Sequence, residues 1–135
     1  MTQINSYLLF NGNCREAMNF YQECLGGELT LQTIGESPLS GRMTKKMKNC
    51  ILHATLSKAG LIIMASDVVG EKGFVKGNSI SLLLNCSSEE EIVAFYKKLS
   101  EGGTKDHPVK ESFWGASFGD LTDKFGTNWV LYFKK

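Results

Sequence analysis

The sequence lacks a marked excess of either charge. Its 15 lysines and arginines are balanced by 14 aspartates and glutamates, for a net charge of +1. Domains that bind nucleic acid usually carry a strongly basic surface or stripe. The densest basic run, Lys45, Lys46 and Lys48, lies between two apolar segments, and we interpret it as a solvated loop rather than a site for phosphate or an acidic ligand. We expect no nucleic-acid partner.

The four cysteines form no Cys-x-x-Cys pair, and no cysteine and histidine spacing matches a zinc module. The sequence shows no local cause that would activate one of these thiols as a nucleophile. It also lacks an apolar run of the ~18 residues needed to span a membrane. Residues 1–10 lack the basic-then-apolar pattern of a secretory signal. We therefore expect a cytoplasmic protein with reduced thiols and no membrane partner.

The chain contains enough apolar residues to form a hydrophobic core. Apolar residues make up 42% of 135, and charged residues 21%. A chain near 150 residues buries roughly 68–70% of its unfolded surface. Length and composition therefore predict one globular domain, residues 1–135.

Hydrophobic periodicity predicts a strand, a helix and three further strands in the first half. The strands are expected at 4–10, 28–34, 49–57 and 61–66, and the helix at 14–25. Asn13, with Glu16 three residues on, is typical of a helix start, and Gly26-Gly27 of a helix end. Residues 35–48 are expected to form a long connection.

The second half repeats this order after a glycine-containing segment, 69–77, which we interpret as a linker. Strands are expected at 79–84, 104–109, 113–121 and 128–134. A helix is expected at 88–101, because Ser87 or Ser88 suits its N-cap and acidic residues fill its first turn.

Particular residues recur along with the elements. Phe20-Tyr21 in the first predicted helix and Phe95-Tyr96 in the second are separated by 75 positions, and each pair is followed by a leucine and a Gly-Gly. Glu16 and Glu91 keep the same separation. Repeats of this kind indicate a repeated structural unit. We therefore predict two βαβββ modules.

A strand, a turn and then a helix ending Phe-Tyr-x-x-x-Leu-Gly-Gly resemble the opening of the vicinal oxygen chelate (glyoxalase/bleomycin-resistance/dioxygenase) superfamily. Further motifs resemble its PhnB-like subgroup: Leu9-Phe10-Asn11-Gly12-Asn13, His53-Ala54, Met64-Ala65-Ser66-Asp67, Phe113-Trp114-Gly115-Ala116 and Thr122-Asp123-Lys124-Phe125-Gly126 with Trp129. The resemblance implies an α+β fold in which modules at about 1–68 and 78–135 form a cup-shaped mixed sheet. It also implies a homodimer.

Metal-dependent members of the superfamily hold a divalent ion in the cup with His, Gln or Glu. Aligned on the Phe-Tyr pairs and on Asp123, the corresponding positions here are Ser6, Ser81 and Val130. None is a competent ligand for such an ion, and the adjacent residues are no better. We therefore expect no metal ion and no other cofactor.

Strand alternation predicts which residues line the cavity. Tyr7 and Leu9 are assigned to the helix-facing side of their strand. The opposite side of the strands is assigned to the cavity, with candidate ligand-binding residues His53, Trp114, Phe118, Tyr132, Ser6 and Ser81.

Two of these candidates leave alternatives open. His53 either lines the cavity, where it is also a candidate general base, or is a structural histidine satisfied by its neighbours. Trp114, with Phe118 and Tyr132, either forms an aromatic wall for a planar or cationic ligand or packs in the core. His107, beside Pro108, is expected at the surface.

The resulting hypothesis is a PhnB-like protein that binds a small molecule in the sheet cavity without metal. The alternative is an enzyme, of lyase, isomerase or dioxygenase type, that uses His53 as a general base with no metal or with one bound in an atypical place. The subgroup's labels refer to phosphonate operons and to a ubiquinone methyltransferase. Methyl transfer is not favoured, because no Gly-rich loop follows a strand as a nucleotide site would require.

Overall fold

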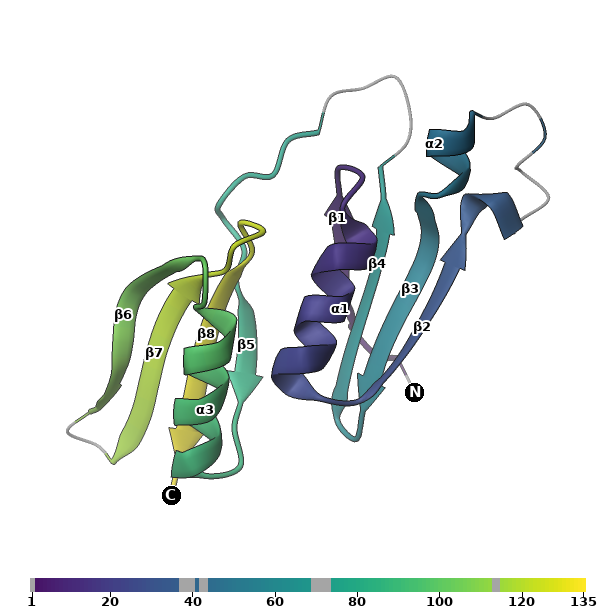
Figure 1. Cartoon of the computed structure of the whole chain (residues 1–135). Helices are drawn as coiled ribbons and strands as arrows, with labels where there is room; N and C mark the ends of the chain where they lie inside the picture. Colours follow the sequence, from purple (N-terminus) through teal and green to yellow (C-terminus); the bar gives the residue numbers. More distant parts are fainter. Residues whose placement is uncertain (1, 37–40, 42–43, 69–73, 113–114) are drawn as a thin grey trace. The chain divides into compact units, whose positions relative to one another are not determined.

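The computed structural model describes residues 2–36, 41, 44–68, 74–112 and 115–135. The chain divides into two compact units, Met1–Val75 and Lys76–Lys135, so the division falls within the segment 69–77 (Figure 1). Each unit has its own four-stranded sheet and its own long helix. The fold is α+β, as the sequence predicts.

The first unit contains strand β1 (Ser6–Phe10), helix α1 (Cys14–Leu25) and strands β2 (Glu28–Thr33), β3 (Ile51–Lys58) and β4 (Leu61–Asp67). Its strand order is β1-β4-β3-β2. The β1–β4 pair is parallel and the other two pairs are antiparallel. Helix α1 packs on one side of this sheet, against β2, β3 and β4.

The second unit contains strand β5 (Leu82–Asn85), helix α3 (Glu89–Leu99) and strands β6 (Thr104–Glu111), β7 (Ala116–Thr122) and β8 (Asn128–Lys134). Its strand order, β5-β8-β7-β6, reproduces that of the first unit, again with one parallel pair, β5–β8. The prediction of two βαβββ modules is therefore confirmed. Strand β5 begins later than expected, so Ser81 precedes it.

The connection between β2 and β3 has more structure than predicted. It contains a 3-10 turn, Ile34–Glu36, and a short helix, α2 (Lys45–Lys48). Thr44 accepts a hydrogen bond from the Met47 amide and so caps α2. The lysines expected in a loop are therefore on one helical turn, because a local side-chain cap can stabilise such a turn without any apolar periodicity.

The two long helices begin in different ways. Ser88 caps α3 by accepting from the Glu91 amide at 3.1 Å, and Glu91 accepts from the Ser87 amide at 2.9 Å. The predicted serine cap is confirmed. At α1 the capping-box expectation is wrong, because the Asn13 side chain makes no cap hydrogen bond.

Asp67 takes the place of the missing cap on α1. Its two carboxylate oxygens accept from the amides of Cys14, at 2.9 Å, and Ile51, at 2.8 Å. The buried carboxylate therefore joins the start of α1 to the start of β3. A partner this far along the chain cannot be found from local capping patterns.

The core of each unit lies between its helix and its sheet. Buried side chains of the sheets include Phe10, Leu56 and Ile63 in the first unit and Leu121, Trp129 and Leu131 in the second. On β8 the predicted faces are correct. On β1 they are reversed, because Phe10 is buried whereas Tyr7 and Leu9 are about half exposed. Both sides of β1 are apolar, so alternation alone could not assign them, and a shift of one residue exchanges the faces.

The repeated Gly-Gly pairs mark a close approach of the backbone. Gly27 has a φ of +102°, and a Cβ added to it would lie 2.8 Å from the Ser57 carbonyl oxygen. A Cβ on Gly103 would overlap the carbonyl oxygen of Thr122. The chain leaving each helix therefore runs too near the neighbouring strand to carry a side chain.

Candidate functional site

The side of each sheet opposite its helix carries three of the six candidate residues, His53, Phe118 and Tyr132, and we call these sides the first and second open faces. In the first unit one register row runs across four strands, through Tyr7, Met64, Thr55 and Thr30. The neighbouring pair joins His53 to Gln32. The first open face therefore combines a phenol, a thioether, hydroxyls, an amide and an imidazole.

His53 is the central polar group of the first open face. It is half-buried on β3, and its Nε2 lies 3.1 Å from the hydroxyl of Thr55. Its ring lies 6.2 Å from the ring of Tyr7, centroid to centroid, at an interplanar angle of 38°. The structure thus brings together an imidazole, a hydroxyl and an aromatic ring from strands β1 and β3. Tyr7 lies on this open face, and not on the helix-facing side of β1 that alternation predicted.

The second open face carries the predicted aromatic pair. Phe118 on β7 is directly opposite Tyr132 on β8, as the sequence analysis expected. Phe118 is 43% exposed and Tyr132 is half-buried. Trp114, the third member of the proposed aromatic wall, lies outside the described residues. The two rings therefore lie side by side in register on the second open face, and both are at least partly exposed.

The two candidate serines lie apart from these groups. Ser6 shares the side of β1 that carries Phe10, and its hydroxyl donates to the Ile62 carbonyl at 3.2 Å. Ser81 is exposed, immediately before β5. Neither serine makes a described side-chain contact with His53, Phe118 or Tyr132, so their role in ligand binding stays a prediction.

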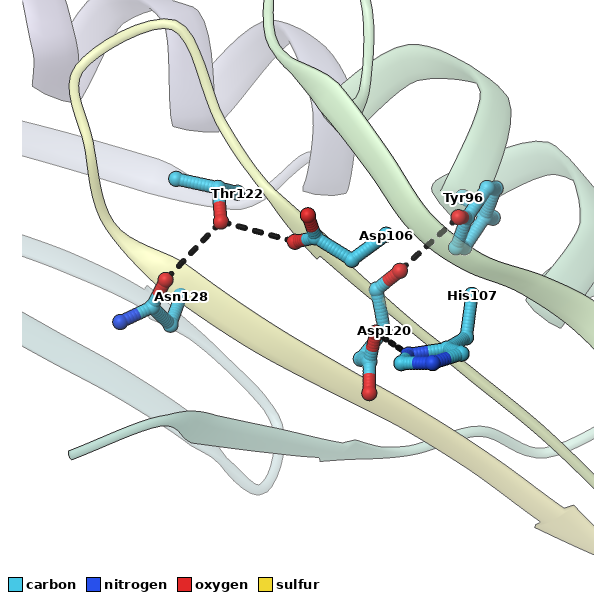
Figure 2. Close-up of polar contacts among 6 residues, drawn as sticks. All are labelled: Tyr96, Asp106, His107, Asp120, Thr122 and Asn128. Atoms are coloured by element: carbon cyan, nitrogen blue, oxygen red, sulfur yellow. Dashed lines mark hydrogen bonds and ion pairs between the residues drawn. The ribbon is translucent and has the colours of Figure 1, made fainter. Parts of the chain in front are cut away.

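A polar network on the second open face was not recognised from the sequence (Figure 2). His107, expected at the surface, is 80% exposed, but its Nδ1 lies 2.8 Å from the Asp120 carboxylate. The Thr122 hydroxyl is 2.8 Å from Asp106 and 3.0 Å from Asn128. These residues come from β6, β7 and β8, and their contacts depend on strand register, so no local motif could have indicated them.

The open faces offer no ligands for a divalent ion where the first and last strands of each unit pair. The pairs there are Tyr7 with Met64 and Leu83 with Val130. Thioether and aliphatic side chains do not ligate the hard or borderline ions that carboxylate and imidazole sites hold. Across the described ranges, no three His, Cys, Asp or Glu side chains gather as a metal site would require.

The cysteines are poorly suited to nucleophilic chemistry. Burial, with a smaller contribution from Asp67, raises the pKa of Cys14 to about 12. Burial and then Glu91 raise the pKa of Cys86 to about 11, and burial also raises the pKa of Cys50. A thiol must ionise to attack, so these three remain protonated at neutral pH.

Comparison with known proteins places the chain in a family. Residues 2–132 match the family model described as 3-demethylubiquinone-9 3-methyltransferase. A Bacillus cereus structure described as a putative 3-demethylubiquinone-9 3-methyltransferase, PhnB protein, is 28% identical with a TM-score of 0.77, covering 98% of this chain and 99% of that one. The chain is a member of the PhnB-like family.

Two further relatives cover nearly the whole PhnB-like chain. Protein YjdN of Escherichia coli is 33% identical over 139 residues, which is 95% of this chain and 92% of YjdN. Protein PA1353 of Pseudomonas aeruginosa is 37% identical with a TM-score of 0.88, covering 99% and 98% of the two chains. A glyoxalase-related enzyme from Fulvimarina pelagi, at 18% identity and a TM-score of 0.65, shares the fold and covers 99% of this chain and 89% of that one. The fold is therefore the one found in glyoxalase-related proteins.

No helix in the described part of the PhnB-like chain is both long enough and apolar enough to cross a membrane.

Proposed function

We propose that this PhnB-like protein binds a small molecule on its open sheet faces, without a metal ion, in the cytoplasm. The contrast between the two sides of each sheet carries the proposal. The helix-facing sides are closed by buried apolar residues such as Leu56 and Leu131. The open faces instead place an imidazole, hydroxyls and aromatic rings next to one another, as mostly apolar ligand sites with a few polar groups do.

His53 is the proposed polar anchor on the first open face. Its hydrogen bond to Thr55 joins two residues of one strand, so this bond does not tie β3 to another element. A contact of that kind orients the imidazole but contributes little to holding the sheet together. The Tyr7 ring beside it offers a surface for the apolar part of a ligand.

Metal-free binding is proposed because of the side chains at the superfamily's ligand positions. Ser6, Ser81 and Val130 offer two hydroxyls and an aliphatic group, and Tyr7 and Met64 on the first open face are no better. Without an ion, the usual stabilisation of an enolate or alkoxide by the metal is lost, which favours binding over that chemistry.

The alternative function is an enzyme in which His53 acts as a general base. The position of its Nε2 beside a hydroxyl, on a face bearing an aromatic ring, is the observation that favours it. In this alternative the substrate would displace the Thr55 contact and donate its proton to His53. Binding is preferred because no carboxylate, thiol or second imidazole has a described contact with His53.

Two measurements on the purified protein test this proposal. Elemental analysis, followed by calorimetric titration with Zn²⁺, Ni²⁺ and Mn²⁺, is expected to show no stoichiometric ion. An NMR screen with small aromatic and hydroxylated fragments is expected to shift the amides around His53, Thr55 and Tyr7 more than those of α1. One tightly bound ion per chain, lost on substitution of an open-face residue, would refute metal-free binding. Fragment shifts confined to the helices would refute the site.

A further inference from the structure

Strand β6 is irregular in a way that brings two ionisable side chains to one face. Thr104 pairs with Thr122 and His107 with Asp120, so three residue steps on β6 span two on β7. In a regular strand the adjacent residues Asp106 and His107 would point to opposite sides. Here Asp106 contacts Thr122 and His107 contacts Asp120, and both partners lie on the second open face (Figure 2). Bulges that redirect side chains in this way are frequent next to functional sites.

The contact of Nδ1 with Asp120 leaves Nε2 of His107 as the nitrogen that can accept a hydrogen bond from a ligand. Nδ1 of the ring is 2.8 Å from Asp120 Oδ1, so a neutral imidazole that donates through Nδ1 carries its lone pair on Nε2. The carboxylate also stabilises the imidazolium formed when Nε2 takes a proton. Tyr96 of α3 donates to the Asp120 carbonyl at 2.9 Å and so ties this point of β7 to the helix beneath it.

An aromatic surface lies beside this pair. Phe118 precedes Asp120 by two positions on the same side of β7, which is about 6.8 Å along a strand. Phe118 is opposite Tyr132, and Asp120 is opposite His107. The aromatic pair and the imidazole therefore lie in neighbouring rows of the second open face.

We propose that the second open face binds a planar aromatic ring bearing an ionisable hydroxyl group, a phenol, which contacts Phe118 and Tyr132 and donates its hydroxyl to Nε2 of His107. The hydroxyl proton passes to Nε2, leaving a phenolate and an imidazolium that Asp120 stabilises. No bond other than O–H breaks, and nothing is oxidised or reduced. This inference rests on the proposed small-molecule binding and adds the ligand class.

The experiment compares 4-nitrophenol with nitrobenzene, which has the same ring but no hydroxyl. Binding of 4-nitrophenol to the full chain, at a pH where it is mainly neutral, is expected to raise the visible absorbance of its phenolate. His107→Gln and Asp120→Asn are expected to remove this signal and to weaken 4-nitrophenol by about tenfold or more, the equivalent of one hydrogen bond to a charged group. Neither variant should change nitrobenzene binding. Phe118→Ala should weaken both probes, and Glu90→Gln, an exposed acid on α3, neither.

Each other outcome overturns the inference. If both probes bind and Phe118→Ala weakens them, while His107→Gln changes neither, the phenol assignment is wrong but small-molecule binding stands. If 4-nitrophenol binds without a phenolate signal, the proton transfer is wrong. If neither probe binds, the second open face is not the site, and the fragment screen at His53 decides the proposed function separately. Circular dichroism of each variant confirms that a lost signal reflects the site, since the substituted side chains are exposed or half-buried.

Discussion

At the scale of single residues, the two histidines show how a short-range contact defines the role of a side chain. His53 interacts within its own strand, with Thr55, whereas His107 interacts across strands, with Asp120. The first contact leaves the His53 imidazole half-buried on the first open face, on the side of β3 away from the core. The second contact holds Nδ1 of His107 against Asp120 and leaves Nε2 to interact with a ligand.

Replacing His53 by Ala should weaken binding of the NMR fragments while costing little stability. Only one part-buried hydrogen bond is lost, so we expect a decrease in the free energy of unfolding of about 1 kcal/mol or less. Thermal melts of His53→Ala and of Leu56→Ala provide the comparison. Leu56 lies on the buried side of the same strand, and its truncation should cost about 2–5 kcal/mol. A loss for His53→Ala comparable to that of Leu56→Ala would show that His53 is a structural residue.

At the scale of elements, the two modules resemble each other in backbone geometry as well as in their side chains. Gly27 follows α1 and Gly103 follows α3, and both pass close to a strand carbonyl. The helix starts do not repeat in this way. Ser88 caps α3 locally, whereas Asp67 reaches α1 from the end of β4.

Replacing Gly27 by Ala should destabilise the protein by about 1–3 kcal/mol. The added methyl group would meet the Ser57 carbonyl at 2.8 Å in a backbone conformation that alanine rarely adopts. Gly60→Ala is the matched control, because Gly60 lies in the β3–β4 turn with nothing within 4 Å of its added Cβ. Urea denaturation should show a change of about 0.5 kcal/mol or less for this control. Equal effects of the two substitutions would mean that the close approach at Gly27 is not required.

At the scale of the whole molecule, each unit ends in strands that have a neighbour on one side only. In the first unit these are β1 and β2, and in the second β5 and β6. Exposed apolar residues accompany two of the four edges, with Leu9 on β1 and Leu83 on β5. Exposed strand edges favour pairing with another chain unless they are covered.

We therefore propose a homodimer as the assembled form of this protein. Light scattering coupled to size exclusion should give twice the chain mass at micromolar concentrations, with the transition in urea shifting to higher denaturant as the protein concentration rises. A monomer mass throughout that range, with an unfolding midpoint independent of concentration, would contradict the proposal.

The sequence by itself determined the order of the strands and of the two long helices, and the repeat, because these depend on local periodicity, caps and glycines. Helix α1 is predicted at its observed bounds, and of the two serines predicted as the cap of α3 the structure uses Ser88. The Phe118–Tyr132 pairing also followed, since β7 and β8 are neighbours along the chain.

Only the tertiary structure decided which side of β1 is buried and which polar groups meet. Tyr7 and Phe10 lie on opposite sides of β1, both sides are largely apolar, and the folded structure buries the side with Phe10. Asp67 reaches Cys14 across 53 positions. His107 meets Asp120 through a bulge in β6, which changes the alternation of side chains without leaving a pattern in the residues. Contacts of this kind depend on strand register, and register is set by the whole sheet rather than by any one segment of the sequence.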